Sequence, residues 1–238
     1  MPVAAPPAHS PPKLAAVAAA VGAKLTNRPA PPVRSRDVFP ARISVAQFRK
    51  MEEAGVFDGG PRVELLDGFL RELPVPNPIH SATVSIAGEN LREILPAGWH
   101  VRYQDSVTLA TSEPLPDLAV LRGRPVDYLT RHPGPADVAV LIEVAESSLS
   151  TDRNTKARIY AAAGLTPYWI VNLSARRVEV HDEPHPGGGP SSGDDPPRYR
   201  RRDFGPGEAV TFHCGDATVT VPVDALLPPA TEPASAGG

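Results

Sequence analysis

The chain has 238 residues, of which 41% are hydrophobic, with a formal net charge of −3 and a pI near 6.2. This balance excludes a strongly basic coat for nucleic acid or for an anionic membrane, and no run of about 18 apolar residues is present to span a bilayer. The single cysteine, Cys214, excludes an internal disulfide and a cysteine-cluster zinc site.

Proline divides the chain into regions. It occurs 30 times, which is more than twice its average usage of about 5%. Residues 1–40 and 184–238 together hold 19 of the 30 prolines. We therefore predict a disordered Ala/Pro-rich tail at 1–40, one folded domain at 41–227 with an irregular loop at 183–198, and a second disordered tail at 228–238.

The N-terminal tail also imitates targeting segments. Its first 36 residues contain no acid but five lysines or arginines, as in a transit peptide, and Leu14–Ala23 imitates the apolar core of a signal peptide. However, that core is mostly alanine, and no lysine or arginine precedes Lys13. We interpret the segment as a disordered tail of a cytoplasmic protein.

The first structured signals are a helix and a hairpin. Ser44 followed by Gln47 is a capping-box pattern, which predicts a helix that ends near Ala54. Further on, Asp67-Gly68 stands between two short apolar stretches. Because both central positions of a tight hairpin turn take positive φ, this dipeptide predicts a β-hairpin.

The middle of the chain predicts a helix and then strands. Apolar residues between 80 and 95 recur at the spacing of one helix face. Three strands are expected next, at 99–103, 106–110 and 118–121. Residues 138–144 are nearly all apolar and predict a strand that is buried on both faces.

The last third of the chain again predicts a helix followed by strands. A helix is expected from a cap at Ser150 or Thr151 to Ala163, followed by a hairpin over 167–173 and 176–181. Two further strands are predicted, at 209–213 and 217–221. Helices that flank a run of strands predict a mixed α/β or α+β sheet domain.

Carboxylates at strand ends are the first chemical signal. Asp117 opens one apolar strand, and Glu143 lies near the end of the next. Burying a carboxylate is costly unless it is paired, hydrogen-bonded or bound to a cation. Two carboxylates on neighbouring strands suit Mg²⁺ or Mn²⁺, whereas the alternative is a Glu143 that faces the surface or pairs with an arginine.

Lysine usage is the second signal. Only four of the 24 basic residues are lysines, and Lys156 is the one placed on the helix after Glu143. A compact ammonium contacts a water and a phosphate oxygen together more readily than a planar guanidinium does. The alternative for Lys156 is an ordinary solvated helix residue.

These residues occur within a pattern that resembles the Uma2 family of restriction-endonuclease-like proteins, a branch of the PD-(D/E)xK nuclease superfamily. The resemblance covers about residues 43–182, with a weaker strand-rich part to about 227. The motifs that carry it, in chain order, are Val63-Glu64-Leu-Leu-Asp67-Gly68, His80 at the start of a helix, Pro116-Asp117-Leu-Ala-Val120, Ile142-Glu143-Val144 with Asp152, Lys156 and Tyr160, and Gly164-Leu-Thr-Pro-Tyr168-Trp169-Ile-Val171.

The resemblance implies a restriction-endonuclease-like core, in which helices flank a central mixed sheet and extra strands follow at the C-terminus. It also implies a nuclease site in which Asp117, Glu143 and the Val144 carbonyl bind Mg²⁺ or Mn²⁺. Glu64 would hold a second metal or its water. Lys156 would orient the attacking water and stabilise charge on the phosphate.

The lysine departs from the superfamily pattern. Its usual position is two residues after the acid, and here that position is Ala145. Lys156 comes thirteen residues after Glu143, on a helix. We expect it to reach the same site from that neighbouring element. His80, Gln104 and Tyr160 are the expected neighbours of the site, although each also has a structural interpretation.

Three functions remain open at this point. The first is a Mg²⁺-dependent endonuclease that hydrolyses DNA phosphodiester bonds with an activated water. The second is a catalytically inactive nuclease-like fold that serves as a binding or assembly module, for example as a homodimer. The acidic balance favours this module slightly, because phosphate binding needs positive charge. The third is a metal-dependent hydrolase of another phosphoester.

Overall fold

The computed structural model describes residues 40–187 and 195–230. The chain divides into two units, Met1–Pro40 and Ala41–Gly238. All but the last residue of the predicted tail at 1–40, the centre of the predicted loop at 183–198, and residues 231–238 of the predicted C-terminal tail lie outside the described residues. The disorder predicted for these parts stays a prediction.

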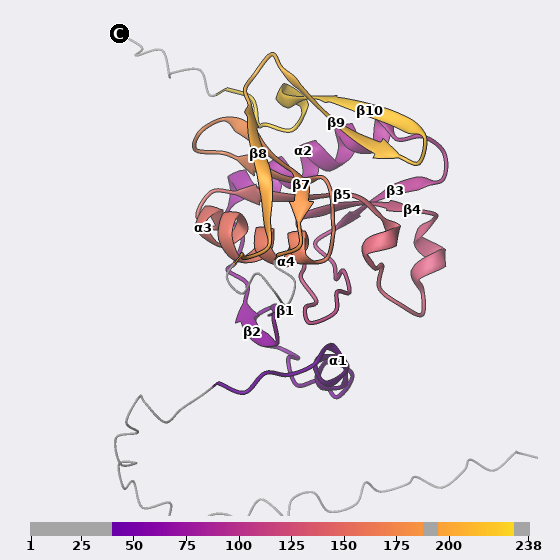
Figure 1. Ribbon diagram of the computed structural model, residues 1–238, viewed down its shortest axis with the longest axis vertical. Helices are drawn as coiled ribbons and strands as arrows, with labels where there is room; N and C mark the ends of the chain where they lie inside the picture. The colour runs from indigo at the N-terminus through magenta and orange to yellow at the C-terminus, as the bar shows by residue number, and fades with distance from the viewer. Residues whose placement is uncertain (1–39, 188–194, 231–238) are drawn as a thin grey trace, which may run out of the picture. The chain divides into compact units, whose positions relative to one another are not determined.

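A six-stranded sheet forms the centre of the second unit, with the strand order β3-β4-β5-β6-β7-β8 (Figure 1). All neighbouring strands are antiparallel except β5 and β6, which are parallel. The sheet is therefore mixed, and the predicted α+β class is confirmed. Its strands are β3 (Trp99–Tyr103), β4 (Leu118–Arg122), β5 (Val138–Ala145), β6 (Tyr168–Asn172), β7 (Arg177–His185) and β8 (Arg198–Phe204).

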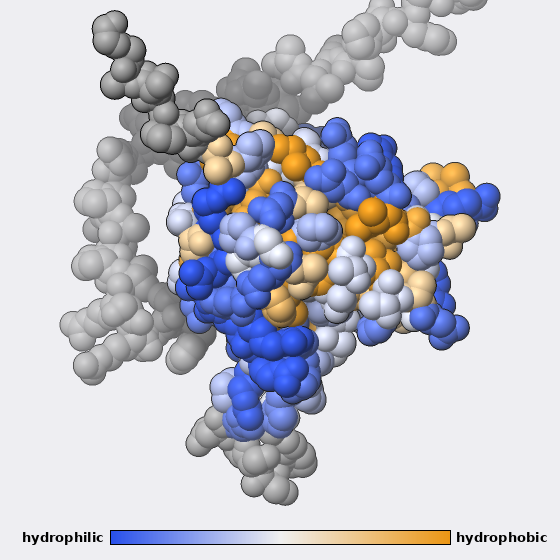
Figure 2. All heavy atoms as spheres, turned by 90° about the horizontal axis from the view of Figure 1, so that it is seen from above, coloured by the Kyte–Doolittle hydropathy of each residue, from blue (hydrophilic) through white to orange (hydrophobic). Residues whose placement is uncertain are grey.

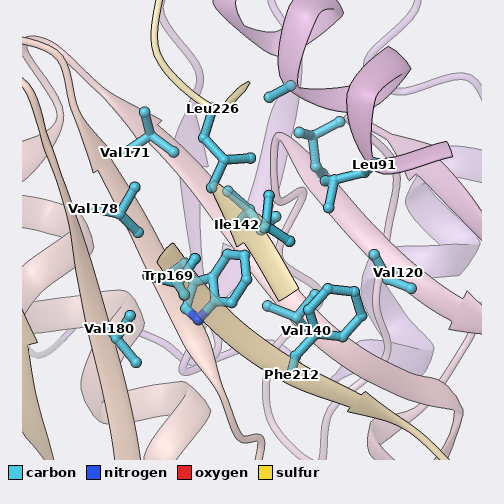
Figure 3. Packing of buried hydrophobic residues seen from close by; sticks show 14 of the residues in the cluster. Leu91, Val120, Val140, Ile142, Trp169, Val171, Val178, Val180, Phe212 and Leu226 are labelled. Atoms are coloured by element: carbon cyan, nitrogen blue, oxygen red, sulfur yellow. The ribbon is translucent and has the colours of Figure 1, made fainter. Parts of the chain in front are cut away.

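One face of the sheet packs against α2 (Pro78–Ile94) and the hairpin of β9 (Ala209–Cys214) and β10 (Ala217–Pro222). Trp169 of the sheet meets Phe212 of the hairpin edge-on, with ring centroids 5.5 Å apart (Figure 3). The predicted strands at 209–213 and 217–221 are confirmed as this hairpin. The helix predicted at 80–95 is also confirmed, although it begins two residues earlier, because Asn77 caps it.

A helical run between β5 and β6 covers the other face. It consists of α3 (Leu149–Thr151), a π-helical turn over Asp152–Lys156, and α4 (Ala157–Ala162). The predicted cap at Ser150 or Thr151 is wrong, because the run begins after Ser148. The Ser148 carbonyl accepts from the N–H groups of Thr151 and Asp152, at 2.8 and 3.1 Å.

A helix and a hairpin precede the central sheet in the sequence, and the hairpin contributes to the site. α1 (Val45–Glu53) carries the predicted capping box at Ser44. β1 (Val63–Leu66) and β2 (Phe69–Glu72) form the predicted hairpin, whose turn residues Asp67 and Gly68 have φ values of 49° and 80°. Two backbone hydrogen bonds between Leu65 and Glu113 attach this hairpin to the chain before β4.

The strand predicted at 106–110 is wrong. Its N–H groups bond to loop carbonyls: Val107 to Pro114 at 3.0 Å and Thr108 to Pro133 at 2.8 Å. Val107 and Leu109 are nevertheless buried in the core under α4. The alternating apolar pattern thus reports burial of an extended segment and not strand pairing.

The predicted loop at 183–198 is shorter at both ends than expected. β7 continues to His185, and β8 begins at Arg198. The basic stretch Arg198-Tyr-Arg200-Arg201-Arg202 therefore lies on a strand. Each of its four arginines pairs with an acid; Arg200 and Arg202, for example, both contact Asp182.

Viewed from above the β9–β10 hairpin, the surface mixes hydrophilic residues with smaller apolar patches (Figure 2). Among the described residues, none of the helices combines the length and apolar character that crossing a bilayer requires.

Candidate active site

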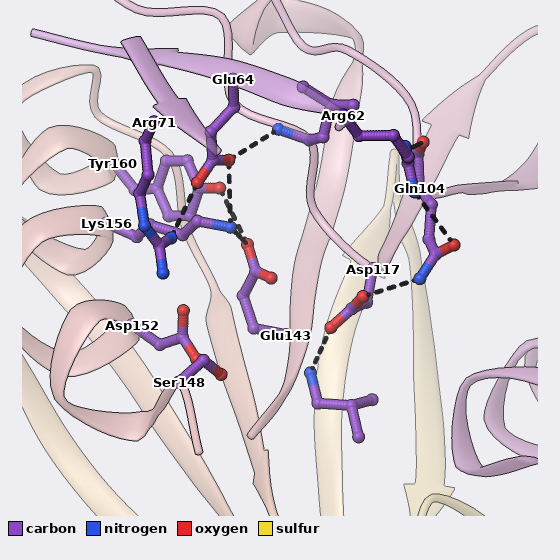
Figure 4. A network of polar contacts seen from close by, with 12 residues as sticks. Arg62, Glu64, Arg71, Gln104, Asp117, Glu143, Ser148, Asp152, Lys156 and Tyr160 are labelled. Atoms are coloured by element: carbon purple, nitrogen blue, oxygen red, sulfur yellow. Dashed lines mark hydrogen bonds and ion pairs between the residues drawn. The ribbon is translucent and has the colours of Figure 1, made fainter. Parts of the chain in front are cut away.

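One pocket, with a cavity volume of about 130 Å³, gathers residues from distant parts of the sequence. They come from the β1–β2 hairpin, the segment before α2, the start of β4, the end of β5 and the π-helical turn. Five of the predicted residues line it, namely His80, Gln104, Asp117, Glu143 and Lys156. Glu64 contacts Lys156 and Tyr160 contacts Glu143, so the structure brings all the predicted side chains together. Figure 4 labels these side chains, apart from His80.

Lys156 lies at the centre of the buried part. Its Nζ is 2.8 Å from Glu143 Oε1 and 3.3 Å from Glu64 Oε2. The Tyr160 hydroxyl donates to the same Glu143 oxygen at 3.1 Å. Burial alone would lower the pKa of the Lys156 ammonium, but Glu143 and Glu64 outweigh it and raise the pKa, so the lysine is charged.

Asp117 is held by three groups at the start of β4. Its Oδ2 lies 3.1 Å from His80 Nε2 and accepts from the Val144 N–H at 2.9 Å, while its Oδ1 accepts from Gln104 Nε2 at 3.2 Å. Burial alone would raise the pKa of this carboxyl, but His80, Val144 and Gln104 together lower the pKa. The aspartate is thus an anion that is already oriented.

His80 is the counterpart of Asp117 in this pair. The hydrogen bond with Asp117 raises the pKa of the imidazole in spite of burial. Its other nitrogen, Nδ1, is buried and has no hydrogen-bond partner among the described residues. His80 therefore does more than begin a helix: it touches a predicted metal ligand, and its second ring nitrogen faces no protein partner.

Val144 contributes through its main chain. Val144 comes directly after Glu143 in β5, and its main-chain N–H donates to Asp117. β4 begins at Leu118, which pairs with Ile142, so Asp117 comes beside Glu143 across the two strands. That the Val144 carbonyl also binds a metal stays a prediction.

More carboxyl groups than arginine and lysine side chains line the pocket: the acids are Asp117, Glu143, Glu146 and Asp152, and the bases are Arg62, Arg71 and Lys156. Burial, together with the nearby carboxylates Asp152, Asp117 and Glu64, raises the pKa of Glu143 well above its ordinary value, although Lys156 opposes this. Burial likewise raises the pKa of Asp152. A divalent cation would relieve this repulsion, and carboxylate oxygens are the donors that Mg²⁺ and Mn²⁺ prefer. The residues present therefore fit such an ion.

The donors are not, however, arranged as a ready metal cage. Across residues 40–187 and 195–230, no group of three or more His, Cys, Asp and Glu side chains stands in metal-binding geometry. The reason is visible around Glu64, whose oxygens are engaged by Lys156, by Arg71 Nη1 at 2.9 Å and by the Leu115 N–H at 3.2 Å. Metal binding at this pocket would thus exchange some of these contacts.

A comparison with protein families identifies the chain. The model of the Uma2 family, described as "Putative restriction endonuclease", matches residues 45–209. The chain belongs to the Uma2 family. The matched region runs from the first residue of α1 to the first residue of β9 and contains every residue of the pocket.

A solved structure supports the same fold. The Uma2 chain is similar to the crystal structure of a "putative nuclease belonging to DUF820" from Anabaena variabilis ATCC 29413, with a TM-score of 0.50 and 14% identity. The similarity covers 77% of this chain and 97% of that chain. At this identity it supports the nuclease-like fold alone. No match to a curated protein was found.

Sequence reasoning missed one side chain of this Uma2 pocket, Arg71, and gave no role to another, Asp152. Arg71 follows the hairpin turn and pairs with Glu64 across β1 and β2. Asp152, which the resemblance included without a role, is 1% exposed and accepts from the Ser148 hydroxyl at 2.5 Å. Strand register gives a signal for Arg71, because Glu64 and Arg71 are directly opposite in a hairpin with a two-residue turn. A helical acid four residues before Lys156 is the signal for Asp152.

Proposed function

We propose that this Uma2 protein is a Mg²⁺- or Mn²⁺-dependent endonuclease that hydrolyses phosphodiester bonds of DNA. The observation that carries the proposal is the convergence of Lys156 with Glu64 and Glu143 in the pocket that Asp117 also lines. The carboxylates could bind a divalent cation, and the ammonium beside them could contact a phosphate. The family, described as "Putative restriction endonuclease", supports the same reaction class.

Each residue has a role in the proposed reaction. Asp117, Glu143, Glu64 and the Val144 carbonyl would hold the ion. When bound, the ion supplies Lewis acidity and lowers the pKa of a water molecule. Lys156, which is positively charged and buried, orients the attacking water and stabilises the charge that grows on the phosphate.

The neighbouring groups keep these side chains in place. Gln104 and His80 fix the orientation of the Asp117 carboxylate from two sides. Tyr160 donates to Glu143 and so holds one of its oxygens toward Lys156. We expect that these three residues act by positioning the acids, because each contacts an acid of the site directly.

Plasmid nicking tests the proposal. In the presence of Mg²⁺ or Mn²⁺, the wild-type chain should convert supercoiled plasmid to the nicked form, and Asp117→Ala should abolish this conversion. Asp216→Asn is the matched control, because Asp216 is an exposed acid in the turn between β9 and β10. Nicking that persists in Asp117→Ala at the wild-type rate would overturn the assignment.

A binding or assembly module is the second candidate function. It is favoured by one observation: Glu64, a predicted metal ligand, is already paired with both Lys156 and Arg71. Isothermal titration with Mg²⁺ and Mn²⁺ separates the two candidates. Saturable binding that Asp117→Asn weakens supports the enzyme, whereas no heat of binding supports the module. Sedimentation would then test its proposed homodimer.

Hydrolysis of another phosphoester is the remaining alternative. The pocket accepts a phosphate group without identifying what is attached to it. Bis(p-nitrophenyl) phosphate is a simple diester that carries no nucleoside. Turnover of this diester without turnover of any nucleic acid would shift the proposal from nuclease to general phosphodiesterase.

A further inference from the structure

An apolar segment stands at the rim of the pocket. Residues 73–77, here called the rim loop, connect β2 to α2, and all five line the pocket. Val75 at its centre is 94% exposed, although it is a large hydrophobic residue. Pro74 and Pro76 fix the backbone on both sides and have no N–H to donate, so the loop is stiff and holds Val75 away from the core.

The rim loop is also anchored at its far end. The Asn77 side chain donates to Glu146, which lines the same pocket. The side-chain Oδ1 of Asn77 accepts from the His80 N–H at 2.9 Å and so caps the start of α2. Ile79, which is 44% exposed, is a second exposed hydrophobic residue and lies in the first turn of α2. An exposed apolar side chain is therefore presented next to the reactive groups by a fixed backbone.

The size and depth of the pocket limit what enters it. Glu143, Asp152 and Lys156 are 4%, 1% and 3% exposed, so a phosphate must reach the bottom of the pocket to meet them. The volume of about 130 Å³ is close to that of a cavity of about 150 Å³ that holds one benzene molecule. It accommodates a single phosphate with a few waters, while the adjoining nucleotides cross the rim.

Duplex DNA does not fit a deep, narrow pocket of this kind well. Its phosphates lie on the outside of a stiff rod with a persistence length of about 150 base pairs. Bringing one phosphate to the bottom of a pocket requires the strand to leave the helix or to bend sharply. A strand with unpaired bases turns freely at each nucleotide and enters without this deformation.

Charge around the pocket leads to the same conclusion. The cations that line it are Arg62, Arg71 and Lys156, and the last two are already paired with acids. Binding that depends on phosphates alone needs many free cations. Affinity must therefore come largely from other contacts, and unpaired bases offer apolar faces for stacking and insertion.

We propose that the rim loop packs Val75 and its two prolines against an unpaired base beside the scissile phosphate. The substrate is then single-stranded or locally unpaired nucleic acid. This inference rests on the proposed nuclease function and specifies the form of its substrate. It assigns Val75 to substrate recognition and gives it no part in the chemistry.

Binding measured without cleavage tests the inference. The full chain is titrated in Ca²⁺, which carboxylate oxygens bind, with a short single-stranded oligonucleotide containing 2-aminopurine, and with the same oligonucleotide in a duplex; gel electrophoresis checks that both stay intact. We expect the single strand to bind more tightly than the duplex and its fluorescence to change on binding. Val75→Asp should weaken single-strand binding by about tenfold, the scale of one lost base contact.

The control is the same substitution at another exposed apolar residue. Leu129 is 82% exposed and is not a lining residue of the pocket, so Leu129→Asp should bind both forms as the wild type does. Val75→Ile should also retain the preference. Because Val75 is almost fully exposed, Val75→Asp should keep the thermal stability of the fold.

The outcomes separate this inference from the nuclease proposal. Equal affinity for both forms, or an unchanged preference in Val75→Asp, overturns the role of the rim loop even if plasmid is nicked. A single-strand preference that disappears in Val75→Asp supports the role of the rim loop even if no DNA is cleaved. In that second case the nuclease proposal fails, and the surface remains a site for unpaired nucleic acid.

Discussion

At the scale of the residue, the chemistry of the pocket depends on the environment of one lysine. Lys156 is 3% exposed and bridges two carboxylates that come from different strands. An arginine would reach these acids with a planar group, whereas the ammonium contacts both as a compact charge. Burial raises the pKa of Glu143 well above its ordinary value, and the charge of Lys156 opposes this rise.

Removing this charge should destabilise the fold. We expect Lys156→Met to lower the free energy of unfolding by about 3–5 kcal/mol, because the buried Glu143 loses its cation, whereas Glu64 keeps its ion pair with Arg71. Adding Glu143→Gln should recover part of the loss, since one buried charge then disappears. Urea denaturation monitored by circular dichroism measures both effects.

The only other lysine among the described residues provides the control. Lys50 is an exposed residue of α1, and Lys50→Met should change the free energy of unfolding by less than about 0.5 kcal/mol. Equal effects of the two substitutions would mean that the buried bridge contributes nothing specific to stability.

At the scale of the element, the β1–β2 hairpin delivers Glu64 and Arg71 to the pocket. Gly68 in its turn has a φ of 80°, and a Cβ at this position would come within 2.9 Å of the Arg42 Cβ and 3.1 Å of the Ile43 carbonyl oxygen. The turn therefore needs glycine for two separate reasons, its backbone conformation and the close approach of the chain before α1.

A pair of glycine substitutions separates these two reasons. Gly207 has nearly the same φ, 81°, and a Cβ there would meet nothing within 4 Å. Gly207→Ala should cost about 1 kcal/mol for the backbone alone, and Gly68→Ala should cost more because of the added contacts. Thermal unfolding of both variants measures the loss of stability. An equal loss would show that Arg42 and Ile43 move away from the added Cβ at no cost in stability.

At the scale of the whole molecule, one row of residues links the helical run to the sheet. Glu143, Ile170, Glu179 and Asp203 are aligned across β5, β6, β7 and β8. Lys156 reaches Glu143, and Arg153, three residues earlier, donates to Glu179 through Nε at 2.8 Å. The helical run is thus fastened to the sheet at two buried carboxylates, one inside the pocket and one outside it.

The outer carboxylate predicts how stability changes with pH. Burial alone would raise the pKa of Glu179, but its contacts with His181, Arg153 and Asn172 lower the pKa well below the ordinary value of 4.5. A depressed pKa in the folded state means that the stabilisation is present above the unfolded pKa. The stabilisation is then lost as the pH falls below it.

Glu179→Gln should therefore destabilise the protein by about 3 kcal/mol at pH 7, and the difference from wild type should shrink as the pH is lowered toward 3. Asp203→Asn is the control, because this neighbouring acid is partly exposed and should cost less than about 1 kcal/mol. Urea denaturation across the pH range measures both. A difference that stays constant with pH would contradict the role given to Glu179.

Much of the local structure could be predicted because it depends on neighbours in the sequence. The Ser44 capping box, the Asp67-Gly68 turn and the apolar face of α2 each follow from a few adjacent residues. The errors have the opposite origin. The segment 106–110 was expected to be a strand, but its hydrogen-bond partners are carbonyls of loops distant in the chain, which alternation of apolar residues does not identify.

The sequence by itself determined the α+β class, most of the elements and the set of side chains to examine, since caps, turns and periodicity are short-range properties. Only the tertiary structure decided how these side chains meet. Glu64 reaches Lys156 because β1 is attached through Leu65 to the segment before β4, and Glu143 reaches it because the helical run crosses between two parallel strands. Such contacts join residues far apart in the chain, so packing of the whole domain is what creates them.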